Sequence, residues 1–181
     1  MLKAFSLGSQ KQKKLLIFDM DETLVAAKFK GSIPEGFVEN FKFPFKDTEI
    51  SVRLRPYVDD VLEKLSGFYE IIVFTAGEQA YADNILDHID PSKKIFRKRL
   101  YRTDCIQIDN FFIKDLDIIL DRDRENIVIV DNSILSFAFD LDNGVPIGSF
   151  MGTEQEDQEL LFLYSFLEEN KDCADIREPI K

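Results

Sequence analysis

The sequence predicts an α/β fold with a doubly wound, mainly parallel sheet, and two observations carry this prediction. First, short apolar runs end abruptly at polar residues. These runs are LLIFDMD (15–21), YEIIVFTAG (69–77) and NIVIVDNS (126–133), with VPIGSF (145–150) as a weaker fourth. Such uninterrupted runs are typical of strands buried on both faces of a sheet. Second, helical patterns lie between the runs, and alternating strands and helices predict right-handed parallel crossovers.

Three segments carry apolar residues at the three- and four-residue spacing of an amphipathic helix. The first follows Pro56 and closes at Gly67, the second covers residues 78–89, and the third lies at 160–167. We expect the acidic stretch 154–159 to begin that last helix, because negative charge stabilises a helix N-terminus.

Two segments interrupt the alternation, and we expect each to be a short β insertion. Residues 26–52 include Phe41, Phe43 and Phe45, whose spacing suits one face of a strand. Core packing is the favoured role for this stripe, ahead of a recognition groove. Residues 95–113 are predicted to form a second small excursion.

Composition bounds the class of protein. A chain of 181 residues with 45% hydrophobic residues predicts one domain, which we place at residues 14–181 after an N-terminal extension of residues 1–13. The net charge of −11 argues against a general nucleic-acid binder, and the basic run at 92–102 is interpreted as a solvated face. Two cysteines fit a reducing, intracellular setting, and no apolar run is long enough to span a membrane.

Polar side chains follow each of the three main apolar runs. They are Asp19 and Asp21, then Thr75, then Asp131 and Asn132. Because the carboxyl ends of parallel strands meet at one edge of a sheet, we expect these side chains to form one site. Positions two apart on an extended chain point to the same side, so the first two carboxylates are expected to act on one substrate.

The residue types at this site suit a phosphoryl group. Two carboxylates held close together repel unless a cation or a proton separates them, and a hard, oxygen-preferring ion such as Mg²⁺ fits the first case. Lys114 would add a positive charge and Thr75 a hydroxyl. In this interpretation Asp19 attacks phosphorus to form an aspartyl-phosphate, while Asp21 acts as general acid and then general base. The chain has no phosphate-cradling glycine loop, so nucleotide cofactors are not indicated.

Several ordered segments then show a resemblance to a known family. DMDETLV matches the DxDxT signature of phosphatases in the haloacid dehalogenase superfamily, and the chain as a whole is similar to the FCP/SCP homology domain. The matching segments are RLRPYVDDVLEKL, YEIIVFTAGEQAYADNILDHIDP, RLYRTDC, FFIKDLDIIL and NIVIVDNS. The resemblance covers roughly residues 14–168.

The resemblance implies a HAD-like, Rossmann-type fold without a large cap domain. It also implies a Mg²⁺-dependent protein serine/threonine phosphatase of the small type, for which the nucleus is the commonest address. The best-known substrate of the family is the phosphorylated C-terminal tail of RNA polymerase II. An open site suits a phosphate on a protein surface or an extended peptide.

The resemblance also assigns roles to individual residues. Asp19 would be nucleophile and metal ligand, and Asp21 acid/base with its carbonyl on the metal. The remaining assignments are phosphate binding for Thr75, Ala76 and Lys114, substrate binding for Tyr81 and Arg102, and metal binding for Asn132 with Asp131 beside it.

The chain departs from the family pattern at the substrate pocket. Glu78 stands where an apolar residue is common, Gly77 where serine is usual, and Ile134 where the family has proline. We expect the carboxylate to be unfavourable for a substrate proline, so Glu78→Leu should improve turnover of polymerase-tail phosphopeptides. Two other functions remain open, namely a catalytically silent peptide-binding scaffold and a phosphatase for small metabolites or lipids.

Overall fold

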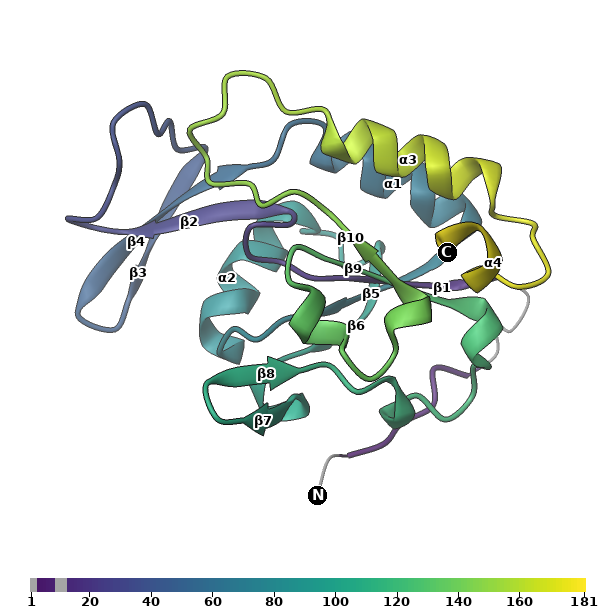
Figure 1. Cartoon of the computed structure of the whole chain (residues 1–181). Coiled ribbons are helices and arrows are strands. Elements are labelled where there is room, and N and C mark those ends of the chain that lie inside the picture. The colour runs from purple at the N-terminus through teal and green to yellow at the C-terminus, as the bar shows by residue number, and fades with distance from the viewer. Residues whose placement is uncertain (1–2, 9–12) are drawn as a thin grey trace.

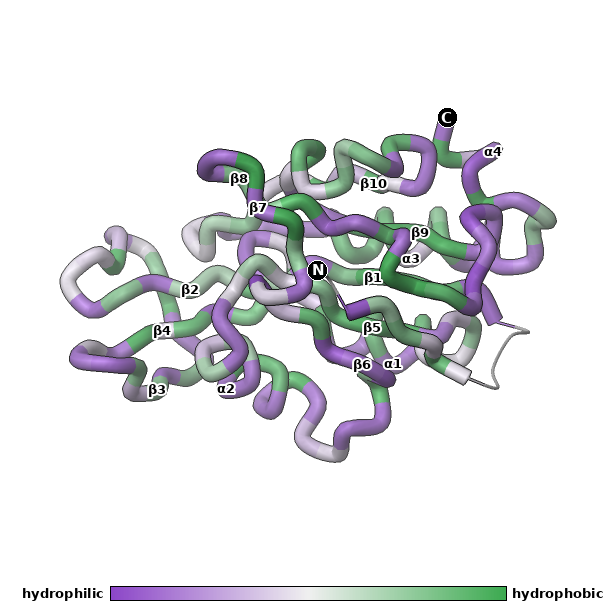
Figure 2. Tube along the Cα trace, turned by 90° about the horizontal axis from the view of Figure 1, so that it is seen from below, coloured by the Kyte–Doolittle hydropathy of each residue, from purple (hydrophilic) through white to green (hydrophobic). Residues whose placement is uncertain are grey.

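The computed structural model describes residues 3–8 and 13–181, and its centre is a five-stranded parallel sheet in the order β10-β9-β1-β5-β6 (Figure 1). The strands are β1 (Leu15–Phe18), β5 (Glu70–Phe74), β6 (Phe96–Leu100), β9 (Ile127–Asp131) and β10 (Gly144–Pro146). Every residue of β1, β5 and β9 is buried, which confirms the strands predicted from the apolar runs. Figure 2 shows these three strands as hydrophobic segments in the middle of the molecule.

The strand order places a topological switch point beside β1. From β1 the chain moves outward through β5 to β6, and it then returns to β9 on the other side of β1 before reaching β10. Phe18 of β1 pairs with Val73 on one side and Val130 on the other, so the carboxyl ends of β1, β5 and β9 are level. Ligand sites in open α/β sheets form at such a point.

Three α-helices share one core with the sheet. They are α1 (Val58–Phe68), α2 (Gln79–Ile89) and α3 (Glu159–Glu169), close to their predicted positions, and a short α4 (Arg177–Ile180) follows. Their buried apolar residues belong to the same cluster as Leu16 and Phe18 of β1, and α1 packs against α3 (Figure 1). No helix in the described ranges is long and apolar enough to cross a membrane.

The other face of the sheet is covered by short elements. They include the hairpin of β7 (Ile106–Ile108) and β8 (Phe111–Ile113) and the 3-10 helices η2 (Leu116–Ile118) and η4 (Ile134–Phe137). Three further 3-10 helices are η1 (Arg102–Asp104), η3 (Arg124–Asn126) and η5 (Leu141–Asn143). Leu15 and Ile17 of β1 point into this second core. Phe5 also contributes to it, and its amide donates to the carbonyl of Ile118 at 2.8 Å. The sheet is therefore enclosed on both faces, with α-helices on one face and the β7–β8 hairpin and 3-10 helices on the other.

The first predicted insertion is a three-stranded antiparallel sheet that projects from the body of the molecule (Figure 1). Its strands are β2 (Val25–Phe29), β3 (Phe41–Phe45) and β4 (Thr48–Leu54), with β4 in the middle. The phenylalanines of β3 have different surroundings. Phe43 is buried in the main core, whereas Phe41 stacks on the ring of His88 with the centroids 3.8 Å apart.

The second predicted insertion, residues 95–113, is only partly correct. Its first part forms β6, which is the fifth strand of the main sheet, and only β7 and β8 form a separate hairpin. The sequence FRKRL hides this role because an edge strand tolerates charged side chains that a central strand excludes. The prediction for the acidic stretch 154–159 is correct only for its last residue, since α3 begins at Glu159. Glu154 instead accepts hydrogen bonds from the amides of Met151 and Gly152.

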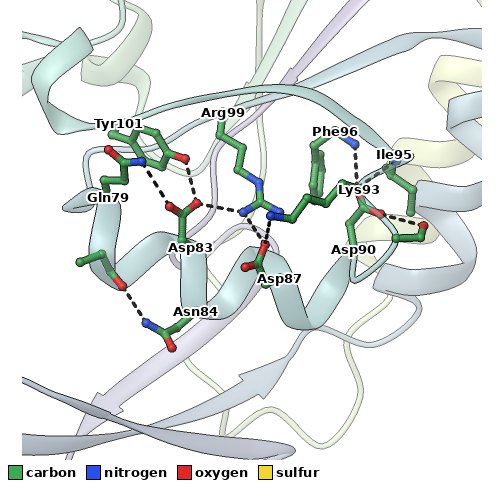
Figure 3. Close-up of polar contacts among 12 residues, drawn as sticks. Gln79, Asp83, Asn84, Asp87, Asp90, Lys93, Ile95, Phe96, Arg99 and Tyr101 are labelled. Carbon is green, nitrogen blue, oxygen red and sulfur yellow. Dashed lines mark hydrogen bonds and ion pairs between the residues drawn. The ribbon is translucent and has the colours of Figure 1, made fainter.

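Two members of the basic run, Lys93 and Arg99, pair with acids on α2 (Figure 3). Arg99 donates to Asp83 at 2.9 Å and to Asp87 at 2.8 Å, and Tyr101 donates to the same Asp83 oxygen. At the C-terminal end of α2, Asp90 accepts hydrogen bonds from three successive amides, those of residues 94–96. These contacts fix β6 and its preceding turn against the helix.

Candidate active site

The three strand ends meet in one cavity of about 520 Å³. Asp19 directly follows β1 and Asp131 ends β9, and both line the cavity together with Asp21 and Asn132. Thr75, which directly follows β5, is 1% exposed and does not line the cavity, whereas the next two residues, Ala76 and Gly77, do. The structure thus brings together the side chains expected at this edge of the sheet.

Lys114 joins the ends of β1 and β9. Its ammonium donates to Asp19 Oδ1 and to Asp131 Oδ2, at 2.5 Å in each case, and its side chain is 1% exposed. The backbone amide of Lys114 donates to the carbonyl of Ser136 in η4, which fixes the segment after β8 beside the site. Burial lowers the pKa of Lys114, but the attraction of the two carboxylates outweighs burial and raises that pKa above its ordinary value.

The two predicted catalytic carboxyl groups both have raised pKa values. Burial raises the pKa of Asp19 to about 7, although Lys114 acts in the opposite direction. Burial also raises the pKa of Asp21 to about 6, while a hydrogen bond from the Tyr81 hydroxyl, 2.5 Å from Asp21 Oδ1, lowers it. A carboxyl group with a pKa near 6 is suited to donate and accept protons close to neutral pH.

The segment after β5 arranges a turn beside the carboxylates. The hydroxyl oxygen of Thr75 accepts a hydrogen bond from the amide of Gly77 at 2.9 Å, which leaves the hydroxyl proton for another acceptor. Ala76 and Gly77 line the cavity, and the Ala76 carbonyl accepts from Arg102 Nε at 2.7 Å. A side chain at Gly77 would approach Thr75 Oγ1 and the Tyr81 ring to 3.2 Å, so this position favours a small residue.

Asp131 and Asn132 differ in what their side chains contact. Both oxygens of Asp131 already accept hydrogen bonds, one from Lys114 and one from the amide of Ser133 at 2.8 Å. The amide nitrogen of Asn132 donates to Glu22 at 3.1 Å and to Ser149. The side-chain oxygen of Asn132 accepts only a long hydrogen bond from the Thr23 hydroxyl, at 3.5 Å, so it keeps a lone pair for a cation.

The inner end of the cavity has the donors and the charge that Mg²⁺ requires. Three carboxyl groups, those of Asp19, Asp21 and Asp131, line the cavity with only one ammonium beside them, that of Lys114, so carboxylate oxygens remain for a cation once Asp19 and Asp21 have lost their protons. Within the described chain, no three His, Cys, Asp or Glu side chains form a ready-made metal centre. A magnesium ion would therefore depend on the predicted mixed set of carboxylate, main-chain carbonyl and the Asn132 amide oxygen, all of them hard ligands.

The cavity lining also contains residues that the sequence did not identify. Ser133 and Ser136 lie beside Asp131 and Lys114, because the Ser133 amide donates to Asp131 and the Ser136 carbonyl accepts from the Lys114 amide. Phe29, Phe45, Lys46 and Thr48 come from the inserted sheet and form the outer end of the cavity. Lys46 lies in the turn between β3 and β4, and its ammonium is 2.9 Å from a carboxylate oxygen of Glu78. The predicted repulsive carboxylate is thus paired with a cation. Lys46 and Glu78 are 32 residues apart in the sequence, so no local sequence pattern predicts that they pair.

A buried arginine supports the loop that carries Asp21. The guanidinium of Arg55 donates to both carboxylate oxygens of Asp157 and to the carbonyls of Thr23 and Gly148. Its side chain is 1% exposed. These bonds connect the segment before α1 with the turn after β1, so Arg55 fixes the position of the loop that carries Asp21 without lining the cavity.

The described residues combine a parallel sheet with a switch point at β1, a buried lysine between two aspartates and no large cap, which is the arrangement expected of a phosphatase-type domain of the haloacid dehalogenase superfamily. The chain matches the family model of the NLI interacting factor-like phosphatases over residues 14–177. It belongs to this family, within the FCP/SCP group that the sequence predicted.

Named relatives and a solved structure agree with this assignment. The chain is 41% identical over 170 residues to CTD small phosphatase-like protein 2 of Dictyostelium discoideum, covering 92% of this chain and 29% of that protein. It is 34% identical to nuclear envelope morphology protein 1 of Saccharomyces cerevisiae, covering 94% of this chain and 42% of the relative. The chain therefore spans less than half the length of these two relatives.

The fold is also that of a solved protein. A structure of the fission yeast RNA polymerase II CTD phosphatase Fcp1 bound to beryllium fluoride superposes with a TM-score of 0.62 at 20% identity, covering 91% of this chain and 54% of that chain. This likeness confirms the α/β architecture with its central parallel sheet.

Proposed function

We propose that this chain is a Mg²⁺-dependent protein serine/threonine phosphatase that works through a phosphorylated Asp19. The observation that carries the proposal is the placement of Asp19, which Lys114 holds by a buried hydrogen bond, in the same cavity as Asp21. Bound Mg²⁺ would supply charge neutralisation for the phosphate and for the attacking carboxylate.

In the first step, an oxygen of Asp19 forms a bond to phosphorus while the bond from phosphorus to the serine or threonine oxygen breaks. The departing oxygen takes the proton of Asp21. The raised pKa of Asp21 keeps a fraction of this carboxyl group protonated near neutral pH, and Tyr81 fixes its orientation. Lys114 holds the attacking carboxylate in place and contributes positive charge beside the phosphate.

In the second step, a water oxygen forms a bond to phosphorus and the bond to Asp19 breaks. Asp21, now a carboxylate, takes a proton from that water molecule. Inorganic phosphate leaves, and both carboxyl groups return to their starting states. The hydroxyl of Thr75 and the amides of the following turn are proposed to bind the phosphate oxygens.

The proposed substrate is a phosphoserine or phosphothreonine in a protein. Lys46 and Arg102 at the outer end of the cavity have side chains that are 60% and 46% exposed, so the entrance is accessible to a peptide. The C-terminal tail of RNA polymerase II is our candidate substrate, because one relative is named CTD small phosphatase-like protein 2 and the solved structure of the same fold is an RNA polymerase II CTD phosphatase. The nucleus is the proposed location, and the yeast relative named for nuclear envelope morphology supports it.

Hydrolysis of an aryl phosphate in the presence of Mg²⁺ tests the proposal. The wild-type chain should hydrolyse it, and Asp19→Asn should reduce kcat by about 10³-fold or more, because the variant lacks the nucleophile. Asp109→Asn is a matched control, since Asp109 is an exposed residue in the turn between β7 and β8 and lies outside the cavity lining.

The same assay separates the alternative functions. A wild-type chain that binds phosphopeptides but hydrolyses neither them nor the aryl phosphate would be a scaffold, and the proposal would fail. A panel that includes sugar phosphates, phosphatidic acid and phosphopeptides would separate a protein phosphatase from a metabolite or lipid phosphatase. We expect the highest kcat/KM with the phosphopeptides.

A further inference from the structure

We propose that Lys46 and Arg102 form a second anion-binding subsite at the outer end of the catalytic cavity. This subsite would select substrates that carry another negative group close to the phosphate that is removed. That group would be a carboxylate or a second phosphate. The proposal rests on the proposed function, because it names the class of substrate for the same site.

The two cations come from distant parts of the chain and line the same cavity as Asp19 and Asp21. Lys46 lies in the turn of the β3–β4 hairpin, and Arg102 begins η1, directly beyond β6. A ligand whose phosphate occupies the inner end of this cavity would therefore extend past both cations on its way to solvent.

The charges at the outer end are not balanced. Lys46 Nζ is 2.9 Å from Glu78 Oε2, and Arg102 Nη1 is 3.6 Å from Glu78 Oε1. One carboxylate is thus shared by two cations, and the described residues at this end of the cavity retain one positive charge. An anionic group on the substrate would neutralise this remaining positive charge. Glu78 would keep the two cations close together.

Both cations are held in place before any ligand binds. Arg102 Nε donates to the Ala76 carbonyl at 2.7 Å, and its guanidinium carbon lies 5.1 Å from the centroid of the Phe112 ring. Lys46 Nζ lies 5.0 Å from the centroid of the Phe45 ring. These contacts use one of the five N–H donors of Arg102 and leave others for a ligand. Such preorganisation reduces the entropy lost on binding.

A purely structural role does not account for these pairs. The side chains of Lys46, Glu78 and Arg102 are between 44% and 60% exposed, and ion pairs at that exposure contribute little to stability. The β3–β4 hairpin that carries Lys46 also has an ordinary surface ion pair for comparison. Lys42 of β3 lies 3.2 Å from Glu49 of β4, and neither residue lines the cavity.

Matched phosphopeptides test the subsite. The two peptides of each pair would be identical except for one position near the phosphoserine, which is glutamate in one peptide and glutamine in the other. Different pairs would place this difference at different positions. A further series with a second phosphate at these positions would compare phosphate with carboxylate. In the best pair, kcat/KM should be about threefold higher for the glutamate or diphosphorylated peptide, the size expected of an exposed ion pair. The preference should decrease at high ionic strength because exposed charges are screened.

Four forms of the chain give the decisive comparison. The quantity compared is the ratio of kcat/KM for the anionic peptide to kcat/KM for its glutamine partner. Lys46→Met should bring this ratio close to one. Glu78→Gln should raise the ratio, because Lys46 and Arg102 then lose the carboxylate that they share. Lys42→Met should keep the wild-type ratio. A ratio of one in the wild type, or an unchanged ratio in Lys46→Met, would overturn the subsite. If the wild type does not hydrolyse an aryl phosphate either, the proposed function itself fails, so the two failures are distinguishable.

Discussion

Replacing Arg55 with methionine should destabilise the fold far more than the replacement of an ordinary loop arginine would. The guanidinium donates to Asp157 at 2.9 and 2.8 Å, to the Thr23 carbonyl at 3.1 Å and to the Gly148 carbonyl at 2.8 Å. Methionine retains much of the apolar stem and removes every donor. Asp157, whose side chain is 7% exposed, would then be a buried carboxylate without its cation.

The size of the effect follows from this unpaired charge. Removing one partner of a buried ion pair costs about 3 to 5 kcal/mol. With a urea m-value of about 2 kcal/mol per molar, the unfolding midpoint should decrease by about 1.5 to 2.5 M. Urea unfolding followed by circular dichroism measures this shift directly, provided that the m-value is unchanged.

A neighbouring arginine serves as the control. Arg53, in β4, donates to the carbonyl oxygens of Gly152 and Glu154, so Arg53→Met should cost only about 1 kcal/mol. The double variant Arg55→Met with Asp157→Leu should recover part of the loss, because it removes the unpaired carboxylate. Equal shifts for the two arginine variants, or no recovery in the double variant, would refute this reasoning.

Three further predictions concern the site and its supports. In Tyr81→Phe, the pKa of Asp21 should rise because the hydrogen bond that lowers it is lost, so the descending limb of kcat/KM against pH for a phosphoserine peptide should move to higher pH. Burial raises the pKa of Asp90, but the amides of residues 94–96 outweigh burial and lower it. Asp90 therefore stabilises the folded chain at pH values above the pKa of Asp90 in the unfolded chain, which is near 4. This stabilisation is lost as the pH falls through the lower pKa that Asp90 has in the folded chain. Asp90→Asn should cost about 2 kcal/mol in unfolding free energy at pH 7, and less below pH 4. Glu78→Leu should raise kcat/KM for polymerase-tail phosphopeptides about threefold, because it removes a negative charge near the substrate.

Each of these predictions can fail on its own terms. An unmoved pH profile in Tyr81→Phe would show that the tyrosine does not influence the acid. A stability difference for Asp90→Asn that is the same at pH 3 and pH 7 would show that the charge of Asp90 is unimportant. A rate for Glu78→Leu that is equal to or below that of the wild type would remove the idea that Glu78 disfavours the polymerase tail.

Most of the sheet could be predicted because buried parallel strands leave a clear pattern. The runs at 15–18, 70–74 and 127–131 are apolar without interruption, since both faces of each strand are covered. β6 was misassigned because its arginines and lysine lie at the edge of the sheet, where α2 provides the acids that pair with Arg99 (Figure 3). That pairing depends on the tertiary structure, and the strand itself carries no sign of it.

The inner half of the candidate site could be predicted and the outer half could not. Asp19 and Asp21 follow the end of a central strand, so topology alone places them at the switch point. Lys46 reaches the cavity from an inserted hairpin, and its partner Glu78 is the residue before α2. Such contacts arise only when separate elements pack together. The same holds for Arg55, which no local pattern distinguishes from a surface arginine.

The most direct test of the central claim is to find the phosphate on the protein. The chain would be mixed with a phosphoserine peptide and Mg²⁺, quenched in acid within one turnover and digested for mass spectrometry. We expect one added phosphoryl group on the peptide containing residues 15–25, at Asp19, and its disappearance in Asp19→Asn. Turnover with no phosphorylated residue, or with the phosphate on another residue, would contradict it.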